Sequence, residues 1–161
     1  MNVRVGFGYD IHRLVPGRPL MLGGVRVPFE KGLLGHSDGD VAAHALADAL
    51  LGAAGLGDLG RHFPSGDPAW AGASGARILE ETRRILYQNG ATLVQADLTV
   101  VAEEPRLSPH APAMRAALAS ALACEAGALS IKGRTHDGLG EIGRGEAICA
   151  YAVVLVRLGA S

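Results

Sequence analysis

The chain has 161 residues, 48% of them hydrophobic, and a formal net charge of −1 at pH 7. This length fits a single domain over residues 1–161, and the near-neutral charge excludes the basic face of a typical nucleic-acid-binding protein. The chain has no long apolar run for a membrane span or a signal peptide, and Cys124 and Cys149 lack CxxC spacing. We therefore expect a cytoplasmic protein with free thiols that binds neither nucleic acid nor membrane.

The first half of the chain predicts a strand, a hairpin and a helix. Val3–Phe7 alternates as a strand does, and Leu20–Phe29 forms two short apolar runs around Gly23–Gly24, a hairpin signal. From Asp38 the apolar residues repeat with helical spacing until the glycines at 52–57.

The second half alternates between helices and strands. The polar stretch RHFPSGDPAWAGAS is predicted to be a long loop, and Ser74 is a candidate cap for a helix over Gly75–Gln88. A strand over Leu93–Ala102 precedes a helix that starts at Pro109 or Ala111 and ends at Leu122. The last strands are Leu129–Arg134 and Ala147–Leu158, joined by the glycine-rich HDGLGEIGRGE.

This order predicts an α/β (α+β) sandwich. We expect one mixed four-stranded sheet with the core order β-α-β-α-β-β, helices on one face and a small N-terminal hairpin. The final strand, AICAYAVVLV, is continuously apolar, which is typical of a strand buried on both faces. Burial on both faces favours an oligomer.

Asp10 and His12 in YDIHRL form half of a candidate metal site. In an extended segment these two side chains point the same way. The third candidate ligand is His44 in GHSDGDVAAHALAD, where Asp40, His44 and Asp48 recur every four residues on one helical face. The alternative for His44 is a hydrogen-bonded core histidine. In the metal site, Asp48 would be an outer carboxylate that orients the His44 ring, or it is a solvated helix residue. One carboxylate and two imidazoles leave the fourth tetrahedral position open, as at a catalytic Zn²⁺ site.

Two further stretches carry polar groups suited to an anion. Ser37, Asp38 and Asp40 stand where a helix begins, so capping explains the two aspartates, while His36 and Ser37 lie near free helix N–H groups. The GLGEIGRGE stretch lacks the Walker lysine, although its Arg144 is suited to a phosphate. Asp137, in THD just before it, is a candidate Mg²⁺ ligand.

Four stretches, GYDIHRL, LGGVRVPFEKGLLGHSDGDVAAHALADALLGAAGLGDLG, FPSGDP and GRGEAI, together resemble the 2-C-methyl-D-erythritol 2,4-cyclodiphosphate synthase family of the non-mevalonate isoprenoid pathway. The resemblance implies a homotrimer with active sites between adjacent subunits. It implies conversion of 4-diphosphocytidyl-2-C-methyl-D-erythritol 2-phosphate into the cyclic diphosphate with release of CMP. It also implies zinc on Asp10, His12 and His44, with Mg²⁺ or Mn²⁺ accompanying the substrate diphosphate.

The resemblance further implies the site residues. His36 and Thr135 are expected to be catalytic, Asp137 to hold Mg²⁺ and Arg144 to bind phosphate. The residues expected to bind substrate are Asp10, Ile11, His12, His36, Ser37, Asp58, Leu59, Gly60, Phe63, Pro64, Ser65, Gly66, Asp67, Ala102, Glu103, Glu104, Pro105, Arg106, Leu107, Ser108, Arg134, Thr135, His136, Asp137, Glu141 and Arg144. Of these, 102–108 are expected to help form the cytidine pocket from the neighbouring chain, and 58–60 and 63–67 to lie near the methylerythritol part.

Three positions depart from the family pattern. Ser65 stands in FPSGDP where the pattern has FPDTDP, and RTHD at 134–137 replaces TTTE. Glu141 replaces an aromatic residue.

The implied mechanism is intramolecular phosphoryl transfer, in which metal ions and alignment overcome charge repulsion. Three alternatives stay open at this point: a zinc phosphohydrolase with an activated water, a non-catalytic trimeric diphosphate-binding module, and a zinc ion that is purely structural.

Overall fold

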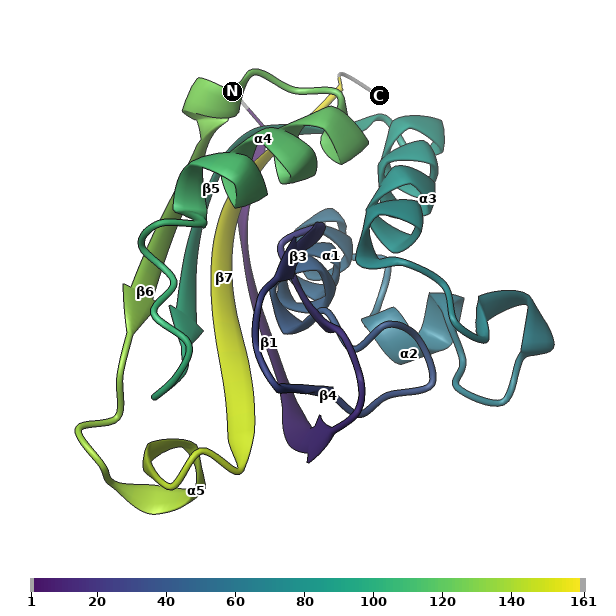
Figure 1. Ribbon diagram of the computed structural model, residues 1–161. Helices are drawn as coiled ribbons and strands as arrows, with labels where there is room; N and C mark the ends of the chain where they lie inside the picture. The colour runs from purple at the N-terminus through teal and green to yellow at the C-terminus, as the bar shows by residue number, and fades with distance from the viewer. Residues whose placement is uncertain (1, 160–161) are drawn as a thin grey trace.

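A computed structural model of the protein describes residues 2–159. Its main sheet has five strands in the order β4–β1–β7–β5–β6 (Figure 1). Strands β5 and β6 pair in parallel and the other neighbours are antiparallel, so the sheet is mixed, as predicted. The strands are β1 (Val3–Pro16), β4 (Lys31–Leu33), β5 (Ala91–Val101), β6 (Leu129–Arg134) and β7 (Ala147–Leu158).

The prediction of four strands is wrong by one, because β4 joins the sheet at its edge. Its Leu33 pairs with Leu14 and its Lys31 with Pro16, at the far end of β1. A three-residue strand is too short to show an alternating pattern, and its pairing depends on a partner distant in the sequence.

The predicted N-terminal hairpin is confirmed. Strands β2 (Leu20–Leu22) and β3 (Val25–Val27) form a separate two-stranded sheet. Gly23 and Gly24 connect them with φ angles of +60° and +77°. Two consecutive positive φ values are what a tight two-residue hairpin turn requires, and glycine adopts them without strain.

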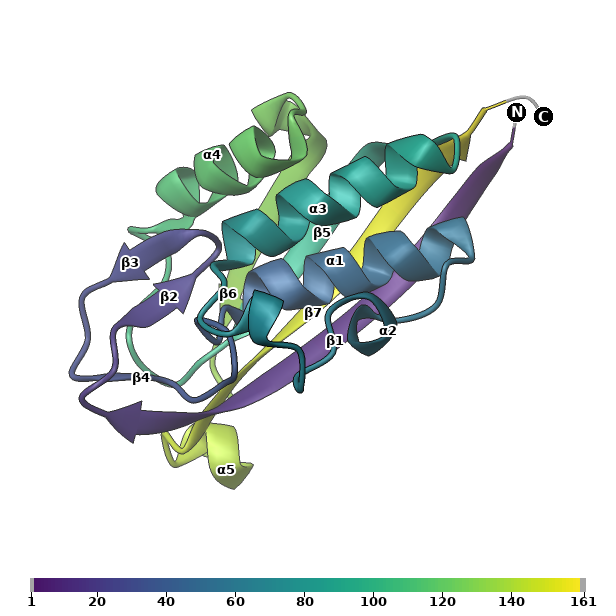
Figure 2. The same cartoon turned by 90° about the vertical axis from the view of Figure 1, so that its right-hand side faces the viewer.

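The three long helices cover one face of the main sheet, as predicted (Figure 2). They are α1 (Val41–Ala54), α3 (Gly75–Gln88) and α4 (Ala111–Leu122). Short helical segments occur in the connections: α2 (Leu59–His62), α5 (Gly140–Gly143) and the 3₁₀ turns η1 (Pro68–Trp70) and η2 (Ala126–Ala128). Within residues 2–159, no helix has both the length and the apolar character needed to cross a membrane.

Two glycines let α1 lie directly on β1. A Cβ atom on Gly6 would lie 2.0 Å from the carbonyl oxygen of Ala49, and one on Gly8 would lie 2.0 Å from that of Ala45. Side chains alternate along a strand, so Asp10 faces the helix as these glycines do. The close approach of the two backbones brings Asp10 within reach of α1.

The opposite face of β1 and β7 is apolar and open to solvent in the single chain. Val5 is 69% exposed, Phe7 62% and Val153 47%. Phe7 pairs with Val153, and Tyr9 with Tyr151. The helices cover only one face of β7, so the predicted burial of its other face, for which the sequence suggested another subunit, is not tested by the single chain. We call this open surface, made by Val3, Val5, Phe7, Tyr9, Ile11, Tyr151 and Val153, the outer sheet face.

Candidate metal centre

The segment before α1 is held by a buried carboxylate. Asp40 is fully buried, and its oxygens accept hydrogen bonds from the backbone N–H groups of Ala43 at 3.1 Å, Gly23 at 2.8 Å and Gly24 at 2.6 Å. Burial raises the pKa of Asp40, although these hydrogen bonds act in the opposite direction. The prediction that Asp40 caps the helix is confirmed, and the same side chain also holds the hairpin turn.

Asp38 ties the same segment to α3. Its carboxylate accepts from the backbone N–H of Asp40 at 3.0 Å and from that of Gly75, the first residue of α3, at 2.8 Å. Asp38 and Asp40 therefore join α1, α3 and the hairpin around the HSDGD segment. Their joint effect is to define the start of α1, one turn before His44.

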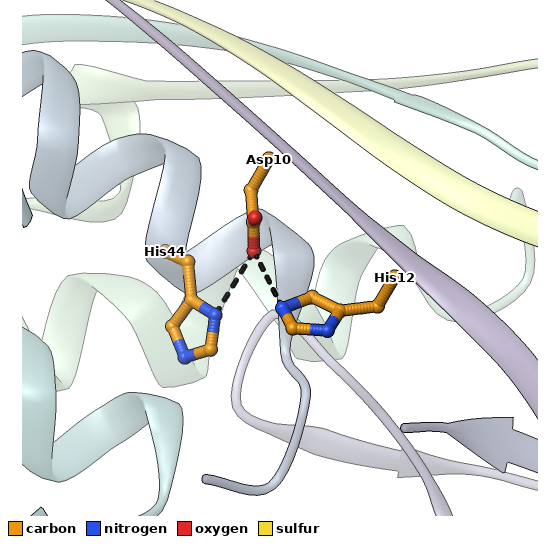
Figure 3. Close-up of side chains that lie close together, drawn as sticks. All are labelled: Asp10, His12 and His44. Atoms are coloured by element: carbon orange, nitrogen blue, oxygen red, sulfur yellow. Dashed lines mark hydrogen bonds and ion pairs between the residues drawn. The ribbon is translucent and has the colours of Figure 1, made fainter. Parts of the chain in front are cut away.

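The three predicted metal ligands converge on one point (Figure 3). Oδ2 of Asp10 lies 3.1 Å from Nε2 of His12 and 3.0 Å from Nδ1 of His44. One donor atom from each residue lies within 4.8 Å of the other two. This is the only group of three or more candidate metal ligands within residues 2–159. The sequence prediction that β1 and α1 bring these residues together is confirmed.

Each imidazole is oriented through its other nitrogen. Nδ1 of His12 lies 2.5 Å from the carbonyl oxygen of Leu34, to which it can only donate. Its Nε2 therefore faces Asp10, where a protonated ring donates to the carboxylate and a neutral ring offers a lone pair to a cation. Nε2 of His44 lies 3.2 Å from Oγ of Ser37, which leaves its Nδ1 toward Asp10. Such outer hydrogen bonds are what fixes the tautomer of a metal-ligating histidine.

The electrostatics keep Asp10 ionised. Burial acts to raise the pKa of Asp10, but the hydrogen bonds from His12 and His44 outweigh it, and the pKa lies below its ordinary value. The hydrogen bond to Asp10 raises the pKa of His12 against the opposing effect of burial. Without a cation, therefore, the two imidazoles partly neutralise the carboxylate.

The donor set fits a Zn²⁺-type cation. Ligand atoms on a tetrahedral zinc ion with bonds of about 2.0–2.1 Å lie about 3.3 Å apart. The separations from Asp10, 3.0 and 3.1 Å, are close to that value. Both imidazoles direct a lone pair inward when neutral, so all three side chains can bind a cation with little rearrangement.

Asp48 does not orient His44. Its Oδ1 instead accepts a hydrogen bond of 2.9 Å from the backbone N–H of Leu59 at the start of α2. Both sequence-based interpretations of Asp48, a partner of His44 or a solvated residue, are therefore wrong. The ring of His44 finds its second partner in Ser37, which the helical spacing did not indicate.

The predicted loop residues from 58 to 67 lie on α2 and the turn that follows it. Asp58 caps α2 by accepting from the backbone N–H of Arg61 at 2.9 Å, and Asp67 caps η1 in the same way through Ala69. Phe63 is buried and packs edge-on against Trp70, with ring centroids 4.7 Å apart. Pro64, Ser65 and Gly66 are exposed, so they form the accessible part of this loop.

His36 lies at the same side of the molecule. Its Nε2 is 3.4 Å from the carbonyl oxygen of Asp67, and its own carbonyl oxygen accepts from the N–H of Gly72. The long polar loop is thus attached to the segment that leads into α1.

A second group of predicted residues gathers at the ends of β5 and β6. Residues 102–108 line a pocket of about 550 Å³ together with Gly133, Arg134 and Thr135. Phe29 also lines it, a contribution that no local signal in the sequence indicates. Glu103 accepts from the backbone N–H groups of His136 at 3.2 Å and Gly138 at 3.4 Å, which ties the two loops together.

The proposed Mg²⁺ and phosphate ligands are exposed. Thr135 donates a hydrogen bond to Asp137 at 3.2 Å. Arg144 pairs with Glu146 at 2.7 Å, and Glu141 lies on the exposed side of α5. Asp137 belongs to no cluster of three candidate ligands among the described residues.

The metal centre and the pocket are separated within one chain. Asp10 pairs with Ala150, Ala150 with Val100, and Val100 with Gly133. Three interstrand spacings of about 4.8 Å place Gly133 roughly 14 Å from Asp10. The resemblance brings these two groups into one site only across adjacent subunits, with residues 102–108 supplied by the neighbouring chain, so their separation within one chain agrees with that expectation.

Comparisons with known proteins agree with these features. The YgbB family model matches residues 3–157. A 2-C-methyl-D-erythritol 2,4-cyclodiphosphate synthase from Symbiobacterium thermophilum is 56% identical over 152 residues, covering 94% of this chain and 97% of the relative. The protein of the same name from Pelotomaculum thermopropionicum is 54% identical over 155 residues, covering 96% of each.

Solved structures share the fold. A 2C-methyl-D-erythritol-2,4-cyclodiphosphate synthase in a CDP-bound form superposes with a TM-score of 0.87 at 42% identity, covering 95% of this chain and 99% of that one. The bifunctional IspDF from Campylobacter jejuni superposes with a TM-score of 0.94 at 35% identity, covering 98% of this chain and 43% of that one.

The α+β fold is that of cyclodiphosphate synthases, and it brings together one carboxylate and two imidazoles that could hold a metal ion. The chain belongs to the YgbB family. The resemblance noted in the sequence is therefore confirmed over nearly the full length of the chain.

Proposed function

We propose that this protein converts 4-diphosphocytidyl-2-C-methyl-D-erythritol 2-phosphate into 2-C-methyl-D-erythritol 2,4-cyclodiphosphate and CMP. The observation that carries this proposal is the convergence of Asp10, His12 and His44, in a chain that is 56% identical to a synthase of that name. The reaction is a step of the non-mevalonate route to isoprenoids.

The bond changes are an intramolecular phosphoryl transfer. An oxygen of the substrate's 2-phosphate forms a bond to the β-phosphorus, and the bond from that phosphorus to the oxygen bridging to the α-phosphorus breaks. CMP leaves with that oxygen. Nucleophile and leaving group are both anions, so no strong side-chain base is required, and the obstacles are repulsion and alignment.

Cations meet the first obstacle. Asp10, His12 and His44 would hold a zinc-type ion and Asp137 would hold Mg²⁺ or Mn²⁺, and the bound cations would supply positive charge beside the reacting phosphates. Mg²⁺ usually keeps several of its water ligands and is bound by only one or two protein carboxylates. The exposed carboxylate of Asp137 suits such a partly hydrated ion. The identity of both metals is part of the proposal.

Polar side chains position the phosphates. In this role Thr135 donates its hydroxyl hydrogen to a phosphate oxygen instead of to Asp137, and His36 donates from its ring. Arg144 exchanges its exposed partner Glu146 for phosphate, which a guanidinium binds bidentately. The exposed turn at 64–66 and the cap residue Asp58 hold the methylerythritol part.

The pocket at residues 102–108 takes the cytidine part. A related synthase and a Plasmodium falciparum relative have been solved with CDP, which supports a cytidine nucleotide as a ligand of this protein. Pocket volume supports it also, because about 550 Å³ lies within the range of small-molecule sites.

The active enzyme is a homotrimer with its sites between subunits. Two features support this assembly. The outer sheet face exposes a continuous group of apolar side chains, which is unusual for a monomer. The metal centre and the cytidine pocket of one chain lie roughly 14 Å apart. A neighbouring chain that supplies the pocket would place the two parts of the site close together. The cytoplasmic location stays a prediction.

Product analysis tests the reaction. Purified protein is incubated with the cytidylated substrate and with Zn²⁺ and Mg²⁺ together, singly or absent, and the phosphorus products are resolved by ³¹P NMR. We expect the cyclic diphosphate and CMP in equal amounts. Linear phosphates would instead indicate a metal-activated water and a phosphohydrolase. Binding without any product would indicate a diphosphate-binding module.

A further inference from the structure

Arg18, in the connection between β1 and β2, has a backbone that is held firmly by β4. A Cβ atom on Gly32 would lie 2.3 Å from the carbonyl oxygen of Pro19 and 2.5 Å from that of Arg18. Only glycine permits this approach, so strand β4 fixes where the side chain of Arg18 starts.

The guanidinium of Arg18 points at the HSDGD segment. Its Nη2 donates a hydrogen bond of 3.2 Å to the carbonyl oxygen of Ser37, and its Nε is buried with no hydrogen-bond partner. None of the ion pairs within residues 2–159 includes Arg18. Arg18 as a whole is only partly buried, but a buried Nε with no hydrogen-bond partner is unfavourable, so this contact calls for an explanation beyond packing.

Arg18 is connected to the candidate metal ligand His44 through two hydrogen bonds, both made by Ser37. Arg18 holds the carbonyl group of Ser37, and Oγ of the same serine lies 3.2 Å from Nε2 of His44. The backbone N–H of Gly39 also approaches this Oγ, at 3.4 Å. In the tautomer that binds a cation, Nε2 of His44 donates to the serine and Nδ1 turns its lone pair to the cation position; without a cation, Nδ1 can donate to Asp10 while Nε2 accepts from the serine hydroxyl.

We propose that Arg18 is a positioning residue of the metal centre. It holds the Ser37 peptide so that the serine hydroxyl fixes the ring orientation of His44 and can accept from Nε2 in the metal-binding tautomer. Arg18 touches neither the cation position nor the reacting groups, and it acts through Ser37 alone. The inference rests on the cation site of the proposed function.

Metal affinity of the purified full-length chain tests the proposal. Zn²⁺ dissociation constants are measured by competition with a chelating dye, and the visible spectrum of bound Co²⁺ reports the ligand geometry. Residues that orient metal ligands change affinity about 10–100-fold, so we expect roughly 3–10-fold weaker Zn²⁺ binding for Arg18→Met, which acts one step further away. We also expect an altered Co²⁺ spectrum. Arg18→Lys, whose ammonium can still donate to the Ser37 carbonyl, should recover most of the affinity.

The matched control is Arg26→Met. Arg26 is exposed on β3 of the nearby hairpin, and its replacement should leave the Zn²⁺ affinity and the Co²⁺ spectrum unchanged. Thermal unfolding of the metal-free proteins shows whether Arg18→Met is folded. If Arg18→Met is not folded, the Zn²⁺ affinities of Arg18→Lys and Arg18→Gln are compared instead. Glutamine removes the charge and shortens the reach to Ser37, so it takes the place of methionine in the comparison.

A double-mutant cycle with Ser37→Ala tests the route. If Arg18 acts through the serine hydroxyl, Arg18→Met changes the Zn²⁺ affinity less than about twofold in the Ser37→Ala background. The proposal would be overturned if folded Arg18→Met bound Zn²⁺ with wild-type affinity. It would also be overturned if Arg18→Met weakened Zn²⁺ binding equally in the wild-type and Ser37→Ala backgrounds. Failure of the wild-type chain itself to bind Zn²⁺ would instead contradict the proposed metal site.

Discussion

Gly8 of β1 and Ala45 of α1 are in backbone contact, and a Cβ atom on Gly8 would lie 2.0 Å from the carbonyl oxygen of Ala45. Asp10 is two residues further along the strand, and His44 is the residue before Ala45. This contact therefore sets the separation between a carboxylate and an imidazole of the metal centre. Stability and metal binding depend on the same close approach.

Gly8→Ala is expected to disrupt both properties. The added methyl group forces β1 and α1 apart, and overpacking of this kind costs about 1–3 kcal/mol or more of unfolding free energy. We expect a loss at the upper end of that range and much weaker Zn²⁺ binding, measured by denaturant unfolding and by metal titration.

Gly52→Ala is the matched control for that substitution. A Cβ atom on Gly52, which is exposed in α1, meets nothing within 4 Å. Alanine is favoured over glycine in a helix by about 0.5–1 kcal/mol, so this variant should be more stable than wild type. Equal effects of the two substitutions would contradict the role assigned to the β1–α1 contact.

Asp40→Asn is expected to destabilise the fold by about 2 kcal/mol, because hydrogen bonds to a charged group are lost and an amide N–H₂ then faces backbone N–H groups. Asp58→Asn is its control, since Asp58 is exposed and asparagine caps helices as well as aspartate does. Urea unfolding measures both variants. A loss of similar size at position 58 would show that the buried network around Asp40 adds nothing beyond capping.

The pH dependence of the Asp40 contribution has a defined sign. Burial raises the pKa of this carboxyl in the folded state, with Asp38 acting in the same direction and His44 against it. As the pH rises above the ordinary aspartate pKa of about 4, the unfolded chain loses this proton first, so the folded state binds more protons. The wild-type advantage over Asp40→Asn in unfolding free energy should therefore shrink as the pH rises, and a growing advantage would contradict this.

Removal of the metal should abolish turnover without unfolding the chain. The three ligands are already assembled without a cation, because Oδ2 of Asp10 lies 3.1 Å from the ring of His12 and 3.0 Å from that of His44. After EDTA treatment we expect an unchanged far-ultraviolet circular dichroism spectrum, a lower melting temperature and activity that returns with Zn²⁺. Unfolding on chelation would identify the metal as structural instead.

His12→Ala tests the same centre by mutation. It removes one of three ligands and should greatly weaken Zn²⁺ binding and abolish activity. His110→Ala is its control, because His110 precedes α4 and makes no side-chain capping bond. Turnover that survives His12→Ala or EDTA would refute a metal-dependent reaction.

Phe7→Glu tests the trimer. Phe7 is 62% exposed in the single chain and lies in the outer sheet face next to Tyr151, with ring centroids 6.3 Å apart. A buried carboxylate there would be strongly unfavourable, so light scattering should show smaller species than wild type, with reduced activity. Tyr87→Glu, at a 78% exposed site on α3 away from this face, should stay trimeric. An intact Phe7→Glu trimer would place the interface elsewhere.

Much of the site could be predicted from the sequence because the signals are local. The two-residue spacing of Asp10 and His12 on a strand defines a common direction, and HSDGD marks the helix start that carries His44. The bounds of α3 and of the last two strands follow from caps, glycines and apolar periodicity. These features depend on neighbours within a few residues.

Tertiary structure alone decided the rest, because it depends on contacts between distant residues. Strand β4 exists only by pairing with the end of β1, and Asp48 binds the start of α2 instead of His44. The apolar β7 does not reveal that the helices cover one of its faces only. Sequence thus determined which side chains belong to the metal centre, while packing determined what orients them and how far they lie from the pocket.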